Sequence, residues 1–165
     1  MATFSYEHLP MAHDIIVYTD GASRGNPGPG GYGAVLMAGQ HRKELSEGFR
    51  KTTNNRMELL AVIRALEALK VEGSKVTVYT DSKYVADAIE KGWVFNWEKK
   101  DFKKKKNPDL WKQLLKLYRK HQVKFYWVQG HANIKENERC DHLAVEASKK
   151  DNLSIDEVYE ASGEA

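Results

Sequence analysis

The order of the predicted secondary-structure elements constrains the fold more than any other feature of this sequence. Three strand-like segments come first and are joined by short turns, a pattern typical of an antiparallel meander. Helical and strand-like segments then alternate, which predicts a mixed sheet covered by helices. The predicted strands span residues 14–20, 31–39, 41–50, 75–81 and 123–130, and the predicted helices span residues 52–70, 82–92, 107–121 and 136–150. The sequence therefore predicts an α/β fold.

Glycine is concentrated directly after the first strand-like segment. That segment ends at Asp20, and six of the next 13 residues are glycine, half of the 12 in the chain. Gly28, Gly30 and Gly33 match the spacing of a dinucleotide-binding turn, but prolines interrupt the turn and the following residues are strand-like rather than helical. We therefore expect no phosphate-binding turn here. The glycines instead indicate that space is kept free beside Asp20.

Two aspartates end strand-like segments of identical sequence. The tetrapeptide VYTD occurs at residues 17–20 and again at residues 78–81. If the two strands are parallel neighbours, Asp20 and Asp81 lie side by side at their carboxyl ends, where open α/β sheets place their sites. The alternative is structural: Asp20 starts a turn and Asp81 caps the following helix. The repeated tetrapeptide favours the first interpretation.

Two further carboxylates, Glu58 and Asp141, stand on predicted helices. Each is followed by alanine and valine at helical spacing, so each side chain is expected to point toward the sheet. The alternative for Glu58 is a capping box with Asn55. Grouped carboxylates repel one another unless protons or cations neutralise them. Oxygen ligands without a Cys/His cluster favour Mg²⁺ or Mn²⁺ over zinc.

Charge is distributed unevenly, although the net charge is only +3. Residues 98–106 hold six lysines against two acids, close to Trp93 and Trp97, whereas residues 151–165 hold five acids and no base. Aromatic side chains beside clustered lysines suit a polymer of phosphates, sugars and bases. The alternative is a solvated basic face and a frayed acidic end. The pattern makes nucleic acid the expected partner.

Other features indicate where such a chain works. The single cysteine, Cys140, excludes a disulfide framework and indicates a reducing compartment, which we expect to be the cytoplasm. The first residues lack the basic and apolar segments of a signal peptide, and no apolar run is long enough for a membrane span. The length of 165 residues fits one domain.

Four segments, in order, resemble the signature blocks of the type 1 ribonuclease H family of bacteria. They read YTDGASRGNPGPGGYG, TTNNRMELLA, YTDSKYV and WVQGHANIKENERCDHLA. The resemblance implies a ribonuclease H-like fold, with a mixed five-stranded sheet flanked by helices. It also implies endonucleolytic cleavage of the RNA strand of RNA–DNA hybrids, leaving 5′-phosphate and 3′-hydroxyl ends. Residues 14–150 would form the catalytic domain, after an extension at residues 1–13 that we expect to be disordered and before an acidic tail at residues 151–165.

The same resemblance implies the catalytic residues. The metal-binding carboxylates of the family fall on Asp20, Glu58, Asp81 and Asp141. Its mobile catalytic histidine falls on His131. Two Mg²⁺ ions, with Mn²⁺ as a possible substitute, would activate a water and stabilise the leaving 3′-oxygen. Asn133 stands where the family usually has glycine, and we expect it to adopt the left-handed backbone that asparagine tolerates.

Substrate contacts are implied in the same way. The asparagines that read the minor groove, where RNA shows its 2′-hydroxyls, fall on Asn26, Asn54 and Asn55. A pocket for a phosphate of the DNA strand falls on Lys51 and Thr53. The basic protrusion, which grips the hybrid outside the cleavage site, falls on Trp93, Trp97, Lys99, Lys100, Lys103, Lys104, Lys105 and Lys106. The glycines after the first strand would then let the nucleic-acid backbone approach.

Two other classes of protein are weighed against this interpretation. A catalytically silent hybrid-binding module would lack a carboxylate, but all four are present. An actin-like ATPase would need a second phosphate hairpin, whereas the segment YTDSKYV runs directly into a predicted helix. The sequence therefore predicts a monomeric, metal-dependent ribonuclease H that binds hybrids without strong sequence specificity.

Overall fold

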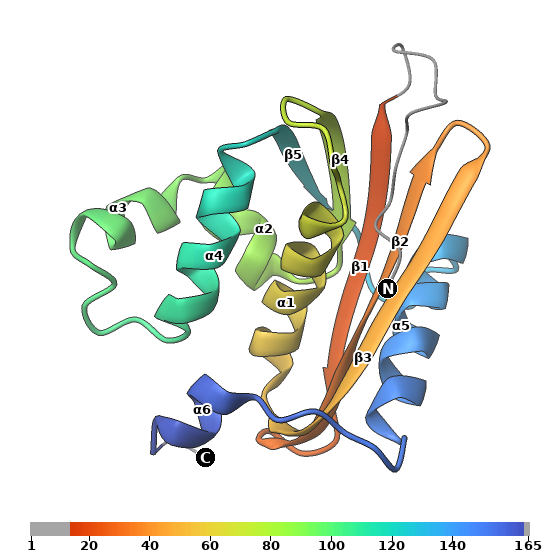
Figure 1. Cartoon of the computed structure of the whole chain (residues 1–165). Coiled ribbons are helices and arrows are strands. Elements are labelled where there is room, and N and C mark those ends of the chain that lie inside the picture. Colours follow the sequence, from red (N-terminus) through yellow and green to blue (C-terminus); the bar gives the residue numbers. More distant parts are fainter. Residues whose placement is uncertain (1–13, 164–165) are drawn as a thin grey trace.

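The computed structural model of this chain describes residues 14–163, which form a single sheet with helices on both faces (Figure 1). The strands are β1 (Ile15–Ser23), β2 (Gly28–Ala38), β3 (His41–Thr52), β4 (Lys75–Thr80) and β5 (Gln122–Trp127). The helices are α1 (Asn54–Glu67), α2 (Lys83–Glu90), α3 (Trp93–Lys99), α4 (Pro108–Tyr118), α5 (Lys135–Ser148) and α6 (Glu157–Ala161). The extension predicted at residues 1–13 lies outside the described residues.

The sheet is mixed, as the element order predicts. Its five strands lie in the order β3-β2-β1-β4-β5. The first three strands of the chain form an antiparallel meander, and β4 and β5 continue the sheet parallel to β1. The prediction of a mixed five-stranded sheet flanked by helices is therefore confirmed.

The two VYTD segments lie side by side in the sheet. Residues 17–19 of β1 pair with residues 78–80 of β4 in parallel register. Asp20 follows while still within β1, and Asp81 follows directly after the end of β4. The repeat thus places two carboxylates side by side where the β1–β4 pairing ends, as the parallel-neighbour interpretation requires.

Helix α1 is buried on almost all sides because it lies between the sheet and α4. Leu59 and Ile63 of α1 and Trp111 of α4 are fully buried in the core that fills this space. The indole N–H of Trp111 donates to the hydroxyl of Tyr84, 2.8 Å away, so this large side chain carries no unpaired polar atom into the core. Because each such apolar side chain contributes roughly 1.5–3 kcal/mol, α1 and the Glu58 that it carries are firmly placed.

Helix α3 is an element that the sequence pattern does not predict. Its residues were interpretable only as aromatic neighbours of the lysine run, yet they form a helix whose Val94 is buried. The following loop, residues 100–107, is anchored by Phe102, which is 4% exposed and packs in the core. The lysines of this loop are therefore held on a defined structure, which projects away from the sheet together with α3 (Figure 1).

The C-terminal segment is packed against the domain, so the interpretation of a frayed acidic end is wrong for residues 151–163. The backbone N–H of Arg50 donates to the carbonyl oxygen of Ser154, which continues the edge of β3. The buried guanidinium of Arg56 on α1 pairs with Asp156 at 2.7 Å and with Asp109 of α4 at 2.7 Å. One arginine thus ties α1, α4 and the C-terminal segment together.

The glycines after Asp20 make room for the protein's own backbone, which corrects the expectation that they clear space for a nucleic acid. A Cβ atom on Gly31 or Gly33 of β2 would lie less than 3.0 Å from a main-chain carbonyl oxygen of α5. A Cβ on Gly21 of β1 would come equally close to the main-chain nitrogen of Glu58 in α1. The absence of side chains at these positions lets helices on both faces lie unusually close to the sheet.

Substitution Gly33→Ala tests this close packing. The new methyl group would meet the backbone of α5, and we expect it to lower the free energy of unfolding by about 3 kcal/mol, the cost of overpacking. Gly73→Ala is the matched control, since Gly73 has a φ of 78° and a Cβ atom added there would meet nothing within 4 Å. This substitution should lower the free energy of unfolding by only about 1 kcal/mol, because alanine is strained at a positive φ. Urea unfolding measures both values, and equal losses would contradict the close-packing account.

Candidate metal centre and active site

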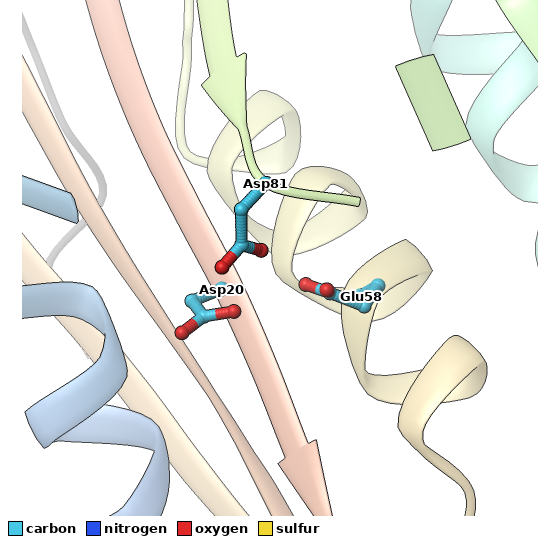
Figure 2. A group of neighbouring side chains, drawn as sticks. All are labelled: Asp20, Glu58 and Asp81. Carbon is cyan, nitrogen blue, oxygen red and sulfur yellow. The ribbon is translucent and has the colours of Figure 1, made fainter. Parts of the chain in front are cut away.

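Three of the predicted carboxylates converge from separate elements. Asp20 comes from β1, Glu58 from α1, and Asp81 from the residue after β4. One oxygen atom of each lies within 4.8 Å of the other two. Figure 2 shows the carboxylate groups turned toward one another where the parallel pairing of β1 with β4 ends. The predicted inward orientation of Glu58 is present in the structure.

These carboxylates are largely withdrawn from water. Asp20 and Glu58 are each 5% exposed, and Asp81 is half-buried. The Oδ1 atom of Asp20 accepts a hydrogen bond of 2.9 Å from the main-chain N–H of Gly21. The Oε1 atom of Glu58 is buried and has no hydrogen-bond partner among the described residues. A buried carboxylate oxygen without a partner is costly unless a ligand supplies one.

Burial and mutual repulsion change the acidity of the group. Burial, followed by the charges of Asp81 and Asp141, raises the pKa of Asp20 to about 9. Burial, followed by the charges of Asp20 and Asp81, also raises the pKa of Glu58 well above its usual value. The metal-free cluster therefore favours protons at neutral pH. An all-oxygen, anionic and partly unpartnered site of this kind fits a hard divalent cation such as Mg²⁺ or Mn²⁺.

Asp141 lies near this group but outside it. It stands on α5 and is half-buried, and its oxygen atoms are not among those that lie within 4.8 Å of one another. Its negative charge nevertheless contributes to the raised pKa of Asp20. The structure thus brings three of the four predicted carboxylates together and places the fourth on the opposite helix, close enough to act electrostatically.

The loop that carries His131 begins against Asp81. A Cβ atom on Gly130 would lie 2.8 Å from Oδ2 of Asp81, so the loop backbone touches this carboxylate. His131 itself is exposed and has a φ of 57°. Asn133 has a φ of 62°, which confirms the left-handed backbone expected where the family usually has glycine. The departure from glycine therefore keeps the backbone conformation of this loop.

The N-terminus of α1 forms a pocket from residues that are distant in sequence. The cap is Thr53, whose hydroxyl accepts a hydrogen bond from the main-chain N–H of Arg56, so the capping box of Asn55 with Glu58 is not formed. The lining residues are Asn26, Pro27, Thr53, Asn55, Lys106, Asn107 and Tyr159. Sequence analysis did not single out Tyr159 as a pocket residue, because it lies in the segment interpreted as a frayed tail. Neither Lys51 nor Asn54 lines this pocket, although the N–H of Asn54 donates to Oδ1 of Asn26.

The basic protrusion forms a second hollow, on α3 and the loop after it. Its lining residues are Trp93, Asn96, Trp97, Lys100, Lys103, Lys104 and Lys105. The ammonium of Lys105 lies 4.9 Å from the ring centre of Trp97, which in turn packs edge-on against Trp111. Lys99 and Lys106 lie outside this hollow, and Lys106 instead lines the pocket at α1. Six of the eight residues predicted for the protrusion therefore share one surface.

Comparisons with known sequences return one family. The sequence profile of the RNase H family matches residues 12–149. The ribonuclease H of Desulforamulus reducens is 60% identical over 148 residues, which are 87% of this chain and 92% of the relative. The ribonuclease H of Rippkaea orientalis is 56% identical over 154 residues, which are 90% of this chain and 94% of the relative.

Solved structures agree with the sequences. LC9-RNase H1, a type 1 RNase H with the type 2 active-site motif, is 31% identical and superposes with a TM-score of 0.77, covering 93% of this chain and 82% of its own. LC11-RNase H1 in complex with an RNA/DNA hybrid is 30% identical, with a TM-score of 0.60 and coverage of 81% and 96%. Within residues 14–163, every helix is too short or too polar to cross a membrane.

The raised pKa of Asp20 means that this carboxyl group lowers the stability of the metal-free protein at neutral pH. Since the folded-state pKa is about 9 and the usual value is 3.8, the native state keeps a proton that the unfolded state releases, and the stability of the native state falls as the pH rises between these values. In a chelator at pH 7, Asp20→Asn should therefore be more stable than wild type, by at most about 4 kcal/mol. The advantage should disappear below about pH 4, where the carboxyl group is protonated in both states.

Denaturant unfolding at these two pH values measures the effect. The exposed Asp151 provides a control, since Asp151→Asn should leave the stability unchanged at either pH. If Asp20→Asn is less stable than wild type at neutral pH, the carboxyl group of Asp20 does not destabilise the metal-free protein, and this explanation is wrong.

Proposed function

The chain is a member of the ribonuclease H family, and from this premise we propose that it cleaves the RNA strand of RNA–DNA hybrids to 5′-phosphate and 3′-hydroxyl ends. The observation that carries the proposal is the group of Asp20, Glu58 and Asp81, two of them buried, which stand in three of the sequence blocks that resemble the family. The related LC11-RNase H1, in complex with an RNA/DNA hybrid, supports the choice of substrate. The curated relatives, which are ribonucleases H and match most of the chain, favour an enzyme over a silent binding module.

The ribonuclease H family is metal-dependent, and the acidic group fits that requirement. We assign two Mg²⁺ ions to the site, with Mn²⁺ as a substitute, held by Asp20, Glu58, Asp81 and Asp141. When bound, the ions supply an activated water and charge stabilisation for the leaving 3′-oxygen. The charge of Asp141 contributes to the raised pKa of Asp20, and this proximity supports the inclusion of Asp141 among the metal ligands.

The side chains around the scissile phosphate would have distinct roles. Glu58 is suited to orient the attacking water, since its Oε1 is buried and lacks a hydrogen-bond partner among the described residues. His131 is exposed on the loop that touches Asp81, and a histidine there can accept a proton from the reaction or help the product leave. The buried position of Asp20 and Glu58 keeps bulk water away from both.

Hybrid binding is assigned to the two hollows and to Asn54 and Lys51, which lie close in sequence to the residues of the hollow at α1. At the start of α1, the amides of Asn26, Asn54 and Asn55 would read 2′-hydroxyls in the minor groove, and Thr53 with Lys51 and Lys106 would hold a phosphate. On the protrusion, the tryptophans and lysines of α3 and its loop would grip the hybrid further along. Contacts of this kind carry no sequence information, and each neutralised phosphate lowers the slope of log affinity against log salt by about 0.9 for B-DNA.

The proposal also covers the extent of the catalytic domain, the cellular compartment and the oligomeric state. Residues 14–150 carry all the catalytic side chains, and the C-terminal segment adds Asp156 and Tyr159 around the start of α1. We place the enzyme in the cytoplasm as a monomer. The single buried Cys140 supports a reducing compartment.

Cleavage of a labelled RNA–DNA hybrid in Mg²⁺ tests the proposed function. Wild type should cut the RNA strand of the hybrid and leave RNA–RNA and DNA–DNA duplexes intact. Asp20→Asn should lower the rate by about 10³-fold or more, because it weakens several kcal/mol of charge stabilisation at the reacting phosphate. Asp151→Asn is the matched control and should cut at the wild-type rate.

The contrary result is equally specific. If wild type binds the hybrid but cuts nothing in either Mg²⁺ or Mn²⁺, the carboxylates are structural and the silent-module alternative replaces the proposal.

A further inference from the structure

Trp127 lies beside Asp81 of the carboxylate group. It is the last residue of β5, where it pairs with Thr80, and 44% of its surface is exposed. Its indole N–H donates a hydrogen bond of 3.0 Å to the main-chain carbonyl oxygen of Asp81. The ammonium of Lys83 lies 4.6 Å from the centre of its ring. This side chain therefore contacts the residues on either side of Ser82, the N-cap of α2.

Asp81 needs such support because it stands between two regular elements. β4 ends at Thr80, and α2 begins only at Lys83. The carbonyl oxygen of Asp81 therefore belongs to neither the sheet ladder nor the helix, and the indole of Trp127 is its hydrogen-bond donor. A hydrogen bond to this oxygen fixes the peptide plane after Asp81. The direction in which the carboxylate points depends on that plane.

Neighbouring residues complete the grip on Asp81. The N–H of Val128 donates to the carbonyl oxygen of Thr80 at 2.9 Å, which extends the pairing of β5 with β4 by one bond. Gly130 then packs against the carboxylate of Asp81 itself. Residues 127–130 thus contact Asp81 at its carbonyl and at its side chain, immediately before His131. The indole is the part of this grip that one substitution removes without disturbing the backbone.

The exposure of Trp127 separates a positioning role from a stabilising one. If the indole N–H is lost, water can reach the carbonyl of Asp81, so the fold loses little free energy. The orientation of the carboxylate would nevertheless be less defined, and a metal ligand that is only loosely oriented binds its ion less tightly. A residue whose loss weakens cation binding while the fold stays stable is a positioning residue.

We propose that Trp127 positions Asp81 through its indole N–H and thereby sets the affinity of the carboxylate group for a divalent cation. This inference rests on the proposed function, since it assumes that Asp81 is a metal ligand. Trp127 acts through Asp81 and does not touch the reacting atoms. It also joins the loop of His131 to the carboxylate site.

Calorimetric titration with Mn²⁺ alone, without nucleic acid, tests the inference. Trp127→Phe keeps an aromatic ring but removes the indole N–H, and it should bind Mn²⁺ about tenfold more weakly than wild type, at the lower end of effects seen when support of a metal ligand is lost. Its thermal unfolding midpoint in a chelator should match that of wild type. Lys83→Met is the matched control, because it removes the ring's cation and keeps the indole N–H. Since it takes a positive charge away from the site, it should bind Mn²⁺ at least as tightly as wild type.

The outcomes distinguish this inference from the proposed function. Mn²⁺ affinity of Trp127→Phe equal to that of wild type overturns the positioning role, whether or not hybrid is cut. An equal loss in Trp127→Phe and Lys83→Met also overturns it, because the ring–cation contact rather than the N–H would then matter. Weaker Mn²⁺ binding by Trp127→Phe alone supports the inference, even if wild type were to cleave no hybrid and the proposed function had to be abandoned.

Discussion

Repulsion among three clustered carboxylates, two of them buried, is the constraint on which the rest of this structure depends. Asp20, Glu58 and Asp81 place oxygen atoms within 4.8 Å of one another, and two of the three side chains are almost fully buried. Two ionised carboxylates about 4 Å apart repel by roughly 4 kcal/mol at an effective dielectric constant of about 20. Such a group is costly to keep together, which supports the proposal that it holds divalent cations. Protons take their place when cations are absent, as the raised pKa of Asp20 shows.

Close packing of two helices against the sheet holds these carboxylates together despite their repulsion. Gly21 lets the first turns of α1, which carry Glu58, approach the strand of Asp20, and Gly33 lets α5, which carries Asp141, approach from the other face. Helix α1 is also held from its outer side, by the core it shares with α4 and by the ion pairs of its buried Arg56. The same arrangement sets the substrate surfaces, because the start of α1 also forms the pocket that includes Thr53. The residues proposed for catalysis and for binding at the start of α1 therefore share one rigid support.

Local signals in the sequence predict much of this arrangement. The VYTD repeat gives the parallel pairing of β1 with β4 and hence the neighbours Asp20 and Asp81. The apolar stripe after Glu58 gives its inward direction. What local signals miss are contacts between distant segments: the glycines face α5 across more than 100 residues of chain, and Asp156 finds its partner on α1. Helix α3 is missed because it is only seven residues long and buries only Val94, so its sequence shows no apolar periodicity. Composition alone cannot tell an acidic tail that is free from one whose carboxylate pairs with a buried arginine.

The proposed divalent cation lies between side chains that would otherwise repel one another. Anomalous X-ray diffraction at the manganese edge, from crystals of the wild-type protein grown with Mn²⁺, locates such an ion directly. The account predicts a peak of anomalous density between the carboxylates of Asp20, Glu58 and Asp81. A protein that cleaves hybrid in Mn²⁺, yet whose crystals show the ion elsewhere and these three carboxylates in contact only with one another, would contradict it.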